Sequence, residues 1–206
     1  MPTWAIIPVK RLRDSKRRLE HLLSPDERAG LIFSFLDNLL SVLDEVPGID
    51  HTLVITGDPG VIALADEHEA ELLLEDRPAG LNVAVSRGVE HAIQQGASAI
   101  LVLPADLPFA RVEDIELMLR PLDDVTESVA ALTGDILDTG TNALLLAPPG
   151  DFFFHYGPGS LQAHLDEAQA HGRAIYLVNA PGLRFDLDTE SDWLVYNGYV
   201  VMVADE

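Results

Sequence analysis

Short apolar runs alternate with longer amphipathic segments along the first half of this chain, and this alternation restricts the fold more than any other feature. The strand-length apolar runs lie at residues 4–9, 52–56, 72–74 and 99–103. The segments with apolar side chains at helical spacing lie at residues 25–45, 60–69, 82–95 and 112–119. Uninterrupted apolar strands separated by helices indicate a mostly parallel sheet flanked by helices on both faces. An α/β fold of this kind binds its ligands at the carboxyl ends of the strands.

The second half of the chain is less regular but continues the pattern. Strands are predicted at residues 128–132, 142–147 and 174–178, and helices at residues 159–171 and 190–198. No linker, low-complexity segment or internal repeat interrupts the sequence. We therefore predict a single domain over residues 1–206.

Composition excludes several classes of protein. Thirteen basic against 34 acidic residues give a formal charge of −21, which repels nucleic acid. The apolar runs are too short to cross a membrane, and the N-terminus lacks the features of a secretory signal. We expect a cytoplasmic protein that binds neither nucleic acid nor membrane. Because the chain contains no cysteine, catalysis must use oxygen and nitrogen groups.

A cluster of positive charge follows the first predicted strand. Six of the 13 basic residues lie between residues 10 and 18, and Lys10 and Lys16 are the only lysines in the chain. A solvated loop is the alternative, but a concentrated basic segment on an acidic protein favours an anion site. No glycine lies between residues 1 and 20, which excludes a glycine-rich phosphate loop. Lysine and arginine side chains would therefore contact phosphates directly.

Two acidic loops form the candidate metal site. Asp106 stands between two prolines after the most apolar strand, where a plain turn is the alternative. Asp186 and Asp188 lie on the same side of an extended segment, and capping of the last helix is an equal alternative for Asp188. Carboxylates with no cysteine and only scattered histidines are the ligand set of a hard cation, and we predict Mg²⁺. The sequence leaves open whether Asp186 or Asp188 is the ligand.

Two further segments have an unusual composition. Residues 138–142 (DTGTN) carry hydroxyl and amide groups directly before a predicted strand. Residues 154–160 (FHYGPGS) lead into a helix whose free N–H groups suit a phosphate or carboxylate, although helix capping is the alternative for Ser160. His155 and His164 are candidate polar contacts, but an isolated histidine is more often a surface or packed residue.

Taken together, these motifs give the chain a resemblance to a known family that runs nearly from end to end. They are IPVK with the basic stretch after it, LSPDER, Gly80-Leu81-Asn82, LPADLP, TGTNALLL, FHYGPGS with His164, and PGLRFDLDT. In this order they resemble the 2-phospho-L-lactate and phosphoenolpyruvate guanylyltransferases, which contribute to biosynthesis of a deazaflavin coenzyme. The resemblance implies a single α/β domain of the glycosyltransferase-A-like, nucleotide-diphospho-sugar transferase-like kind.

The resemblance also implies roles for individual residues. Asp106 and Asp186 would hold the metal. The triphosphate ligands would be Lys10, Lys16 and Arg18, and Asn82 would lie near the nucleotide. The family contacts its phosphorylated acid at the positions of Thr141, Gly157 and Ser160. Two positions depart from the family pattern, because Asp138 stands where glycine is common and Glu190 replaces a frequent proline.

The expected reaction is transfer of GMP from GTP to the phosphate of a three-carbon acid, with release of pyrophosphate. Phosphoenolpyruvate, 2-phospho-L-lactate and 3-phosphoglycerate all stay open as acceptors, because they differ only by a double bond or a hydroxyl position. One alternative is a related nucleotidyltransferase with a sugar-phosphate or molybdopterin acceptor, which the glycine-free loop disfavours. Others are a non-catalytic nucleotide-binding protein and an interaction domain. The oligomeric state is open, with a homodimer as one possibility, and adaptation to salt is an open explanation of the acidity.

Overall fold

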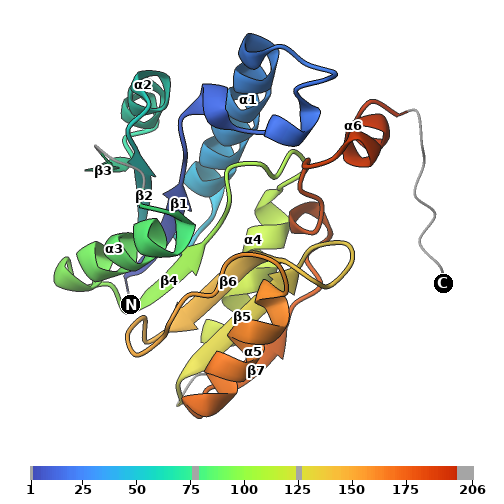
Figure 1. The fold of residues 1–206 in the computed structure, drawn as a ribbon. Coiled ribbons are helices and arrows are strands. Elements are labelled where there is room, and N and C mark those ends of the chain that lie inside the picture. Colours follow the sequence, from blue (N-terminus) through green and yellow to red (C-terminus); the bar gives the residue numbers. More distant parts are fainter. Residues whose placement is uncertain (1, 76–78, 124–126, 199–206) are drawn as a thin grey trace.

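A computed structural model describes residues 2–75, 79–123 and 127–198 of the chain. Within this part, seven strands form one sheet with the order β3-β2-β1-β4-β6-β5-β7 (Figure 1). The strands are β1 (Thr3–Pro8), β2 (His51–Thr56), β3 (Glu71–Leu74), β4 (Ala99–Val102), β5 (Val129–Gly134), β6 (Thr141–Ala147) and β7 (Ala174–Leu177). The helices are α1 (Pro25–Glu45), α2 (Pro59–Glu67), α3 (Leu81–Gln94), α4 (Val112–Leu119), α5 (Ser160–Ala170) and α6 (Glu190–Tyr196). Short 3₁₀ helices are η1 (Leu12–Asp14), η2 (Arg17–Leu19), η3 (Arg120–Leu122) and η4 (Pro181–Leu183).

The sheet is parallel except for one strand. β6 runs antiparallel to both of its neighbours, β4 and β5, while the other pairs are parallel. The predicted mostly parallel α/β fold is therefore confirmed. Because β6 is reversed, its first residue, Thr141, lies at the same edge of the sheet where β1, β4 and β5 end. The β5–β6 pairing also shifts register between Thr133 and Gly134, opposite this point, and such bulges are common beside active sites.

Helices cover both faces of the sheet, as the alternating sequence pattern predicts. In β1, Ala5 and Ile7 face the core formed with α1, α2 and α4, while Trp4 and Ile6 face the core formed with α3 and α5. Figure 1 shows these two helical layers on either side of the sheet. Each predicted strand and helix is present, with ends that differ from the predicted ones by only a few residues.

The longest helix begins where the sequence indicates. The Ser24 side chain accepts a hydrogen bond from the Glu27 N–H, and the Glu27 carboxylate accepts from the Ser24 N–H, while Pro25 occupies the first helical position. This capping box fixes the path of the chain between the basic segment and α1, because the helix can start at only one residue.

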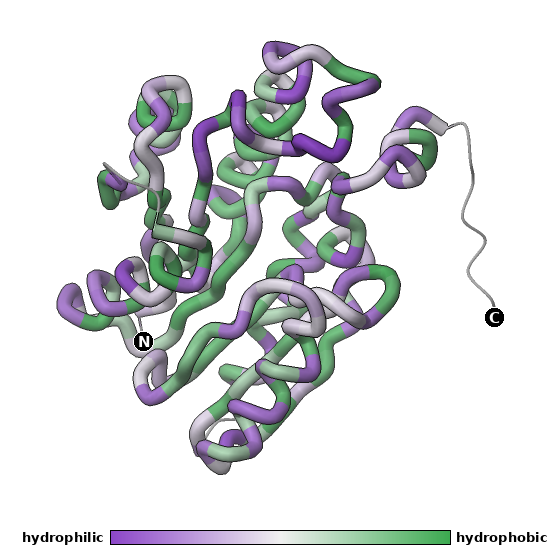
Figure 2. The backbone as a smooth tube through the Cα atoms, viewed as in Figure 1, coloured by the Kyte–Doolittle hydropathy of each residue, from purple (hydrophilic) through white to green (hydrophobic). Residues whose placement is uncertain are grey.

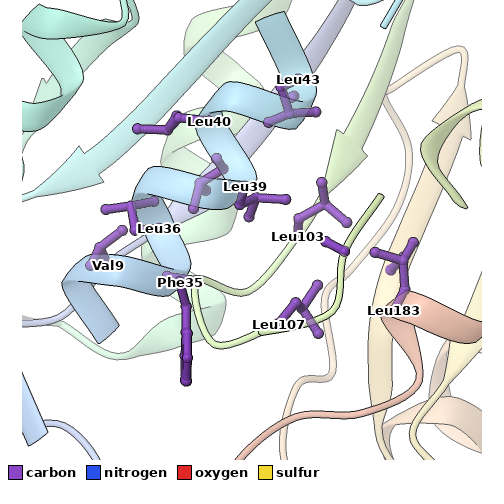
Figure 3. Close-up of a cluster of buried hydrophobic side chains, with 14 of the residues drawn as sticks. Val9, Phe35, Leu36, Leu39, Leu40, Leu43, Leu103, Leu107 and Leu183 are labelled. Carbon is purple, nitrogen blue, oxygen red and sulfur yellow. The ribbon is translucent and has the colours of Figure 1, made fainter. Parts of the chain in front are cut away.

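A buried apolar cluster holds the loop after β4 in place. Leu103 and Leu107, on either side of Asp106, are fully buried and pack in the same core as Leu39 of α1 and Leu183 of η4 (Figure 3). Complete burial of one leucine side chain is worth about 2 kcal/mol. The two leucines therefore anchor the turn to the core, and the Asp106 side chain between them lies at the edge of the sheet.

Candidate active site

A cavity of about 470 Å³ lies at the carboxyl edge of the sheet. One wall is the basic segment after β1, which is among the most hydrophilic stretches of the chain (Figure 2). The opposite walls come from the end of β3, the start of α3 and the loop after β4. The polar and charged side chains that line it are Lys10, Asp14, Ser15, Lys16, Arg17, Arg18, Glu75, Asp106 and Asp188. The basic segment thus lines one cavity together with Asp106 and Asp188, two of the three predicted carboxylates, whereas Asp186 is not among the lining residues.

Lys16 forms ion pairs with two of the predicted metal ligands. Its ammonium group donates to Asp106 Oδ2 and to Asp188 Oδ1, the latter at 2.6 Å, and its side chain is only 4% exposed. Burial alone would lower the pKa of Lys16, but attraction to Asp106 and Asp188 outweighs burial and raises it, so the side chain stays charged. Lys16 adopts a left-handed backbone conformation (φ 51°) between η1 and η2, which turns its side chain inward.

Asp106 is only partly satisfied by protein groups. One carboxylate oxygen, Oδ2, accepts from Lys16, whereas the other, Oδ1, is buried and has no hydrogen-bond partner among the described residues. A buried carboxylate oxygen without a partner carries a free-energy cost of about 1–3 kcal/mol or more. A cation or a proton donor on a bound ligand would remove that cost.

Asp186 lies beside the other two carboxylates. Its Oδ1 accepts from Asn142 Nδ2 at 3.3 Å. Burial, followed by repulsion from Asp106 and then Asp188, raises the pKa of Asp186 to about 6, against the weaker opposing effects of Asn142 and Lys16. The negative charges of Asp106 and Asp188 near Asp186 favour the binding of positive charge.

Asp188 does not cap α6, so the capping alternative for this residue is wrong. The N-cap of α6 is Thr189, whose hydroxyl accepts from the Asp192 N–H while the Asp192 carboxylate accepts from the Thr189 N–H. Because this capping box is complete without Asp188, the Asp188 carboxylate is available to Lys16 and lies 3.9 Å from Arg18. Both Asp186 and Asp188 face the same charged cluster, and the choice of metal ligand between them stays open.

These residues suit a divalent cation, although they do not form a closed cage. No three carboxylate or imidazole groups converge as a ready-made metal site anywhere in the described ranges. Mg²⁺ is commonly held by one or two carboxylates, with water and substrate phosphates completing its coordination. The partnerless Asp106 Oδ1 and the crowded Asp186 provide carboxylate oxygens of this kind.

The other two predicted phosphate ligands are more exposed. Lys10 lies at the surface and lines the cavity, and the Arg18 side chain is 75% exposed. Both stand on the basic segment next to Lys16, so the charges that the sequence places close together remain close in the fold. Their role as triphosphate ligands remains a prediction.

The three residues predicted to contact the phosphorylated acid come together, although 19 residues separate the first from the last. Ser160 Oγ accepts from the Thr141 N–H at 2.9 Å, and the Ser160 N–H donates to the Gly157 carbonyl at 3.1 Å. Helix capping, the alternative for Ser160, is wrong: the N-cap of α5 is Gly159, which has a left-handed conformation (φ 75°), and Ser160 is the first residue of the helix. The Ser160 hydroxyl instead joins β6 to α5.

Asn82 links helix α3 to the loop of residues 154–158. Its amide donates to the Tyr156 carbonyl at 3.1 Å and accepts from the Tyr156 N–H at 2.7 Å. Asn82 is the second residue of α3, whose neighbours Gly80, Leu81 and Ala84 line the cavity. The residue predicted near the nucleotide therefore holds the 154–158 loop against the cavity wall.

Three side chains have a clear place in this site that the sequence marked only weakly or not at all. His164, predicted only as a candidate polar contact, is completely buried and bonds to Thr141. Asn142 holds Asp186, and its position in the TGTN motif was the available signal. Glu75 is buried at the end of β3 and lines the cavity, and only its place directly after a predicted strand could have indicated it.

Both departures from the family pattern are accommodated locally. Asp138 has a left-handed backbone conformation (φ 53°), which explains why glycine is favourable there, and its carboxylate pairs with Arg184 at 2.8 Å. Glu190 is the first residue of α6, a position where an acidic side chain interacts favourably with the helix dipole and where proline is also common.

A membrane-spanning helix was not expected from the sequence. Among the described residues, none of the helices combines the length and the apolar character needed to cross a bilayer.

The fold is shared with a known class of proteins. A similar solved structure is that of a Desulfovibrio desulfuricans protein described as a nucleotide-diphospho-sugar transferase, with a TM-score of 0.75 at 16% identity; the match covers 96% of this chain and 88% of the other. At that identity the likeness shows the fold alone, which is that of the nucleotide-diphospho-sugar transferases.

Sequence comparison identifies the family within that class. Residues 3–197 match the family described as "Guanylyl transferase CofC like", and the chain belongs to this family. It is 38% identical over 196 residues to a phosphoenolpyruvate guanylyltransferase from Rubrobacter xylanophilus, covering 93% of this chain and 92% of the relative. It is 31% identical over 195 residues to a 3-phospho-D-glycerate guanylyltransferase from Colwellia psychrerythraea, covering 93% and 90%. The resemblance seen in the motifs is thereby confirmed.

Proposed function

We propose that this protein transfers GMP from GTP to the phosphate of a three-carbon acid and releases pyrophosphate. The observation that carries the proposal is a single cavity lined both by basic side chains and by carboxylates. The basic side chains are Lys10, Lys16, Arg17 and Arg18, and the carboxylates include Asp106 and Asp188. Family membership and relatives named for this activity support it. Phosphoenolpyruvate is the first acceptor to test, because it appears in the name of the relative with 38% identity, followed by 3-phosphoglycerate and 2-phospho-L-lactate.

The reaction requires two anions to approach each other. An oxygen of the acceptor phosphate attacks the α-phosphorus of GTP and forms a new P–O bond, while the bond from the α-phosphorus to the oxygen that bridges to the β-phosphate breaks. Because the acceptor phosphate is ionised at neutral pH, no general base is needed. The charges of Lys10, Lys16 and Arg18 reduce the repulsion between the two substrates and orient the leaving pyrophosphate.

The carboxylates complete this arrangement with a divalent cation. Asp106, with Asp186 or Asp188, would hold Mg²⁺, which supplies positive charge at the reacting phosphate oxygens. Asn142 orients Asp186 through its hydrogen bond, and the buried leucines beside Asp106 hold that loop rigid. Positioning of this kind is a large part of the rate acceleration in phosphoryl and nucleotidyl transfer.

Glu75 supports guanine as the base. The residue is 8% exposed and lines the cavity together with the apolar residues Ile55, Leu81 and Ala84. Among the described residues, its carboxylate accepts only one long hydrogen bond, 3.5 Å from the Ala79 N–H. A carboxylate presents two acceptors, which match the adjacent N1–H and N2–H donors of guanine, whereas the corresponding edges of adenine and cytosine place an acceptor there.

The product would feed biosynthesis of a deazaflavin coenzyme, which is the role of the family that the motifs resemble. The related enzymes with sugar-phosphate or molybdopterin acceptors are the alternative within the same fold. They are disfavoured because the loop after β1 holds its anion site with side chains and contains no glycine from residue 9 to residue 20.

A panel of substrates tests the proposal. Pyrophosphate release is measured with each of four nucleoside triphosphates, with and without Mg²⁺, against each of the three acids, and products are identified by mass spectrometry. We expect release only when GTP, Mg²⁺ and at least one acid are present together. Silence in every combination would refute the proposal, and nucleotide binding without turnover would identify a non-catalytic protein.

Two aspartate variants test whether the activity lies in this cavity. Asp106→Asn should abolish turnover because it removes a carboxylate from the charged cluster. Asp66→Asn, an equal change of charge on the exposed surface of α2, is the matched control and should retain wild-type turnover. Equal activity of the two variants would place the chemistry elsewhere.

A further inference from the structure

His164 lies behind the predicted acceptor site and is completely buried. It is in the second turn of α5, and both nitrogens of its ring are engaged. Nε2 accepts from the backbone N–H of His155 at 2.8 Å, and Nδ1 lies 2.9 Å from Thr141 Oγ1. The imidazole therefore connects the loop of residues 154–158 to the first residue of β6.

These two contacts determine where the ring carries its proton. A backbone N–H can only donate, so Nε2 must be unprotonated to accept from His155. Burial, with a smaller contribution from His155, lowers the pKa of His164 to about 4, and the ring is neutral near pH 7. A neutral imidazole with an unprotonated Nε2 carries its hydrogen on Nδ1. Nδ1–H is thus the donor and Thr141 Oγ1 the acceptor in the bond between them.

The direction of this hydrogen bond decides whether the Thr141 hydroxyl can donate to a ligand. A hydroxyl has one proton, and because the bond from His164 uses a lone pair of Oγ1, that proton is directed away from the ring. Ser160 repeats the arrangement: its Oγ accepts from the Thr141 N–H, which leaves its own proton for another acceptor. Two neighbouring hydroxyl groups, each with a fixed donor behind it, suit an oxyanion, which only accepts hydrogen bonds.

We propose that His164 is a positioning residue that fixes the Thr141 hydroxyl as a hydrogen-bond donor to an oxyanion of the acceptor acid, with Ser160 as the second donor. This inference rests on the proposed function, because it takes the phosphorylated acid as the ligand at Thr141 and Ser160. His164 itself does not touch the substrate. Its effect should therefore appear in recognition of the acid and be absent from recognition of GTP.

The competing explanation is that His164 only packs the core. Its ring makes an edge contact with Tyr156, with ring centres 4.8 Å apart, and lies 5.9 Å from Phe152. A packing role predicts that any substitution lowers stability and impairs both substrates together. The two explanations therefore differ in which KM changes, and in whether a substitution that preserves the Nδ1–H donor restores function.

Three variants separate the explanations. A glutamine at position 164 places its amide near the position of Nε2, so the hydrogen-bond donor to Thr141 Oγ1 is lost. An asparagine places its amide near the position of Nδ1 and can still donate to Thr141 Oγ1. We expect His164→Gln to raise the KM for the acid about tenfold and to change the KM for GTP by less than about twofold. Tenfold corresponds to about 1.4 kcal/mol, near the lower end of what a hydrogen bond to a charged group contributes. His164→Asn should recover most of this loss. His171→Gln, at the exposed end of α5, is the matched control.

A double-mutant cycle tests whether His164 acts through Thr141. Thr141→Val should reproduce the loss in acid recognition, and the double variant Thr141→Val with His164→Gln should be no worse than Thr141→Val alone. Additive losses, equal changes in both KM values, or a His164→Asn variant as impaired as His164→Gln would each overturn the proposal.

The tautomer is also measurable in the unmodified protein, which keeps the proposal testable if the variants do not fold. Nitrogen-15 NMR of the histidine rings should show His164 protonated on Nδ1 and not on Nε2 between about pH 6 and pH 8. An Nε2-protonated or doubly protonated ring would refute the inference. This result does not depend on turnover, whereas failure of wild-type protein to transfer GMP to any of the three acids would refute the proposed function.

Discussion

Replacing Lys16 by methionine removes the charge that holds two loops of the site together. The ammonium group pairs with Asp106 on the loop after β4 and with Asp188 before α6, and methionine has a similar length without charge. In the variant, Asp106, Asp186 and Asp188 face one another without that cation. We expect the folded state to lose stability, because repulsion among these carboxylates is present only when the loops are brought together.

The burial of the partners sets the size of the effect. Loss of one partner from a fully buried ion pair costs about 3–5 kcal/mol, and loss from an exposed pair about 0–1 kcal/mol. The Lys16 side chain is 4% exposed, but those of Asp106 and Asp188 are 24% and 46% exposed, so water recovers part of the lost attraction. We expect a loss of about 2 kcal/mol in the free energy of unfolding, or a decrease of about 4–8 °C in Tm for a chain of this length.

Urea denaturation followed by circular dichroism measures this loss at several pH values. Lys10→Met is the matched control, because Lys10 carries the same charge on the same segment but is exposed. The deficit of Lys16→Met relative to this control should be largest at pH 7–8 and shrink toward pH 4. The charge of Lys16 opposes the effects that raise the pKa of Asp186, so without the lysine that pKa rises further and stability is lost as pH rises through it.

The reasoning would be refuted if Lys16→Met and Lys10→Met unfolded at the same urea concentration at every pH. It would also be refuted by a deficit that did not change with pH, because loss of packing alone has no such dependence.

Three further outcomes are expected from the site. Asp186→Asn should be more stable than wild type at pH 7–8, by up to about 3 kcal/mol, and the difference should vanish near pH 4 in urea denaturation. The reason is that folding raises the pKa of Asp186 from 3.8 to about 6, mainly through burial, so the wild-type protein loses stability as pH rises between these values. Glu75→Gln should lower kcat/KM for GTP about tenfold and affect ITP, which lacks the N2 amino group, several-fold less; equal losses would argue against base recognition by Glu75. Asn82→Ala should raise the KM for the acid and speed proteolytic cleavage of the 154–158 loop. Asn82→Asp should be intermediate because it keeps the acceptor for the Tyr156 N–H. An unchanged cleavage rate would show that Asn82 does not hold this loop in place.

The sequence by itself determined the elements of the fold and the edge of the sheet that carries the site. Apolar runs such as residues 99–103 are buried strands because every side chain in them is apolar, and the Ser24–Glu27 capping box fixes a helix start by contacts three residues apart. The reversal of β6 was not among the predictions, because parallel and antiparallel strands of the same composition differ only in long-range pairing.

The site could be predicted as a set of loops but not as a set of contacts. Asp106, Asp186 and Asp188 follow strands or precede a helix at positions that the sequence marks, so their presence at one edge could be anticipated. That Thr189 rather than Asp188 caps α6, and that Ser160 bonds to Thr141 instead of capping α5, depended on hydrogen bonds for which both alternatives have the same local pattern.

Only the tertiary structure decided how the charged and polar groups pair. The partners of Lys16 are 90 and 172 residues away, and His164 meets Thr141 across 23 residues. Local periodicity reports which side of an element is buried, but it contains no information about which distant side chain lies opposite. The sequence therefore determined that a basic segment and three carboxylates share one edge of the sheet, and the path of the loops determined that a buried lysine joins two of those carboxylates and that a buried histidine orients the hydroxyl beside them.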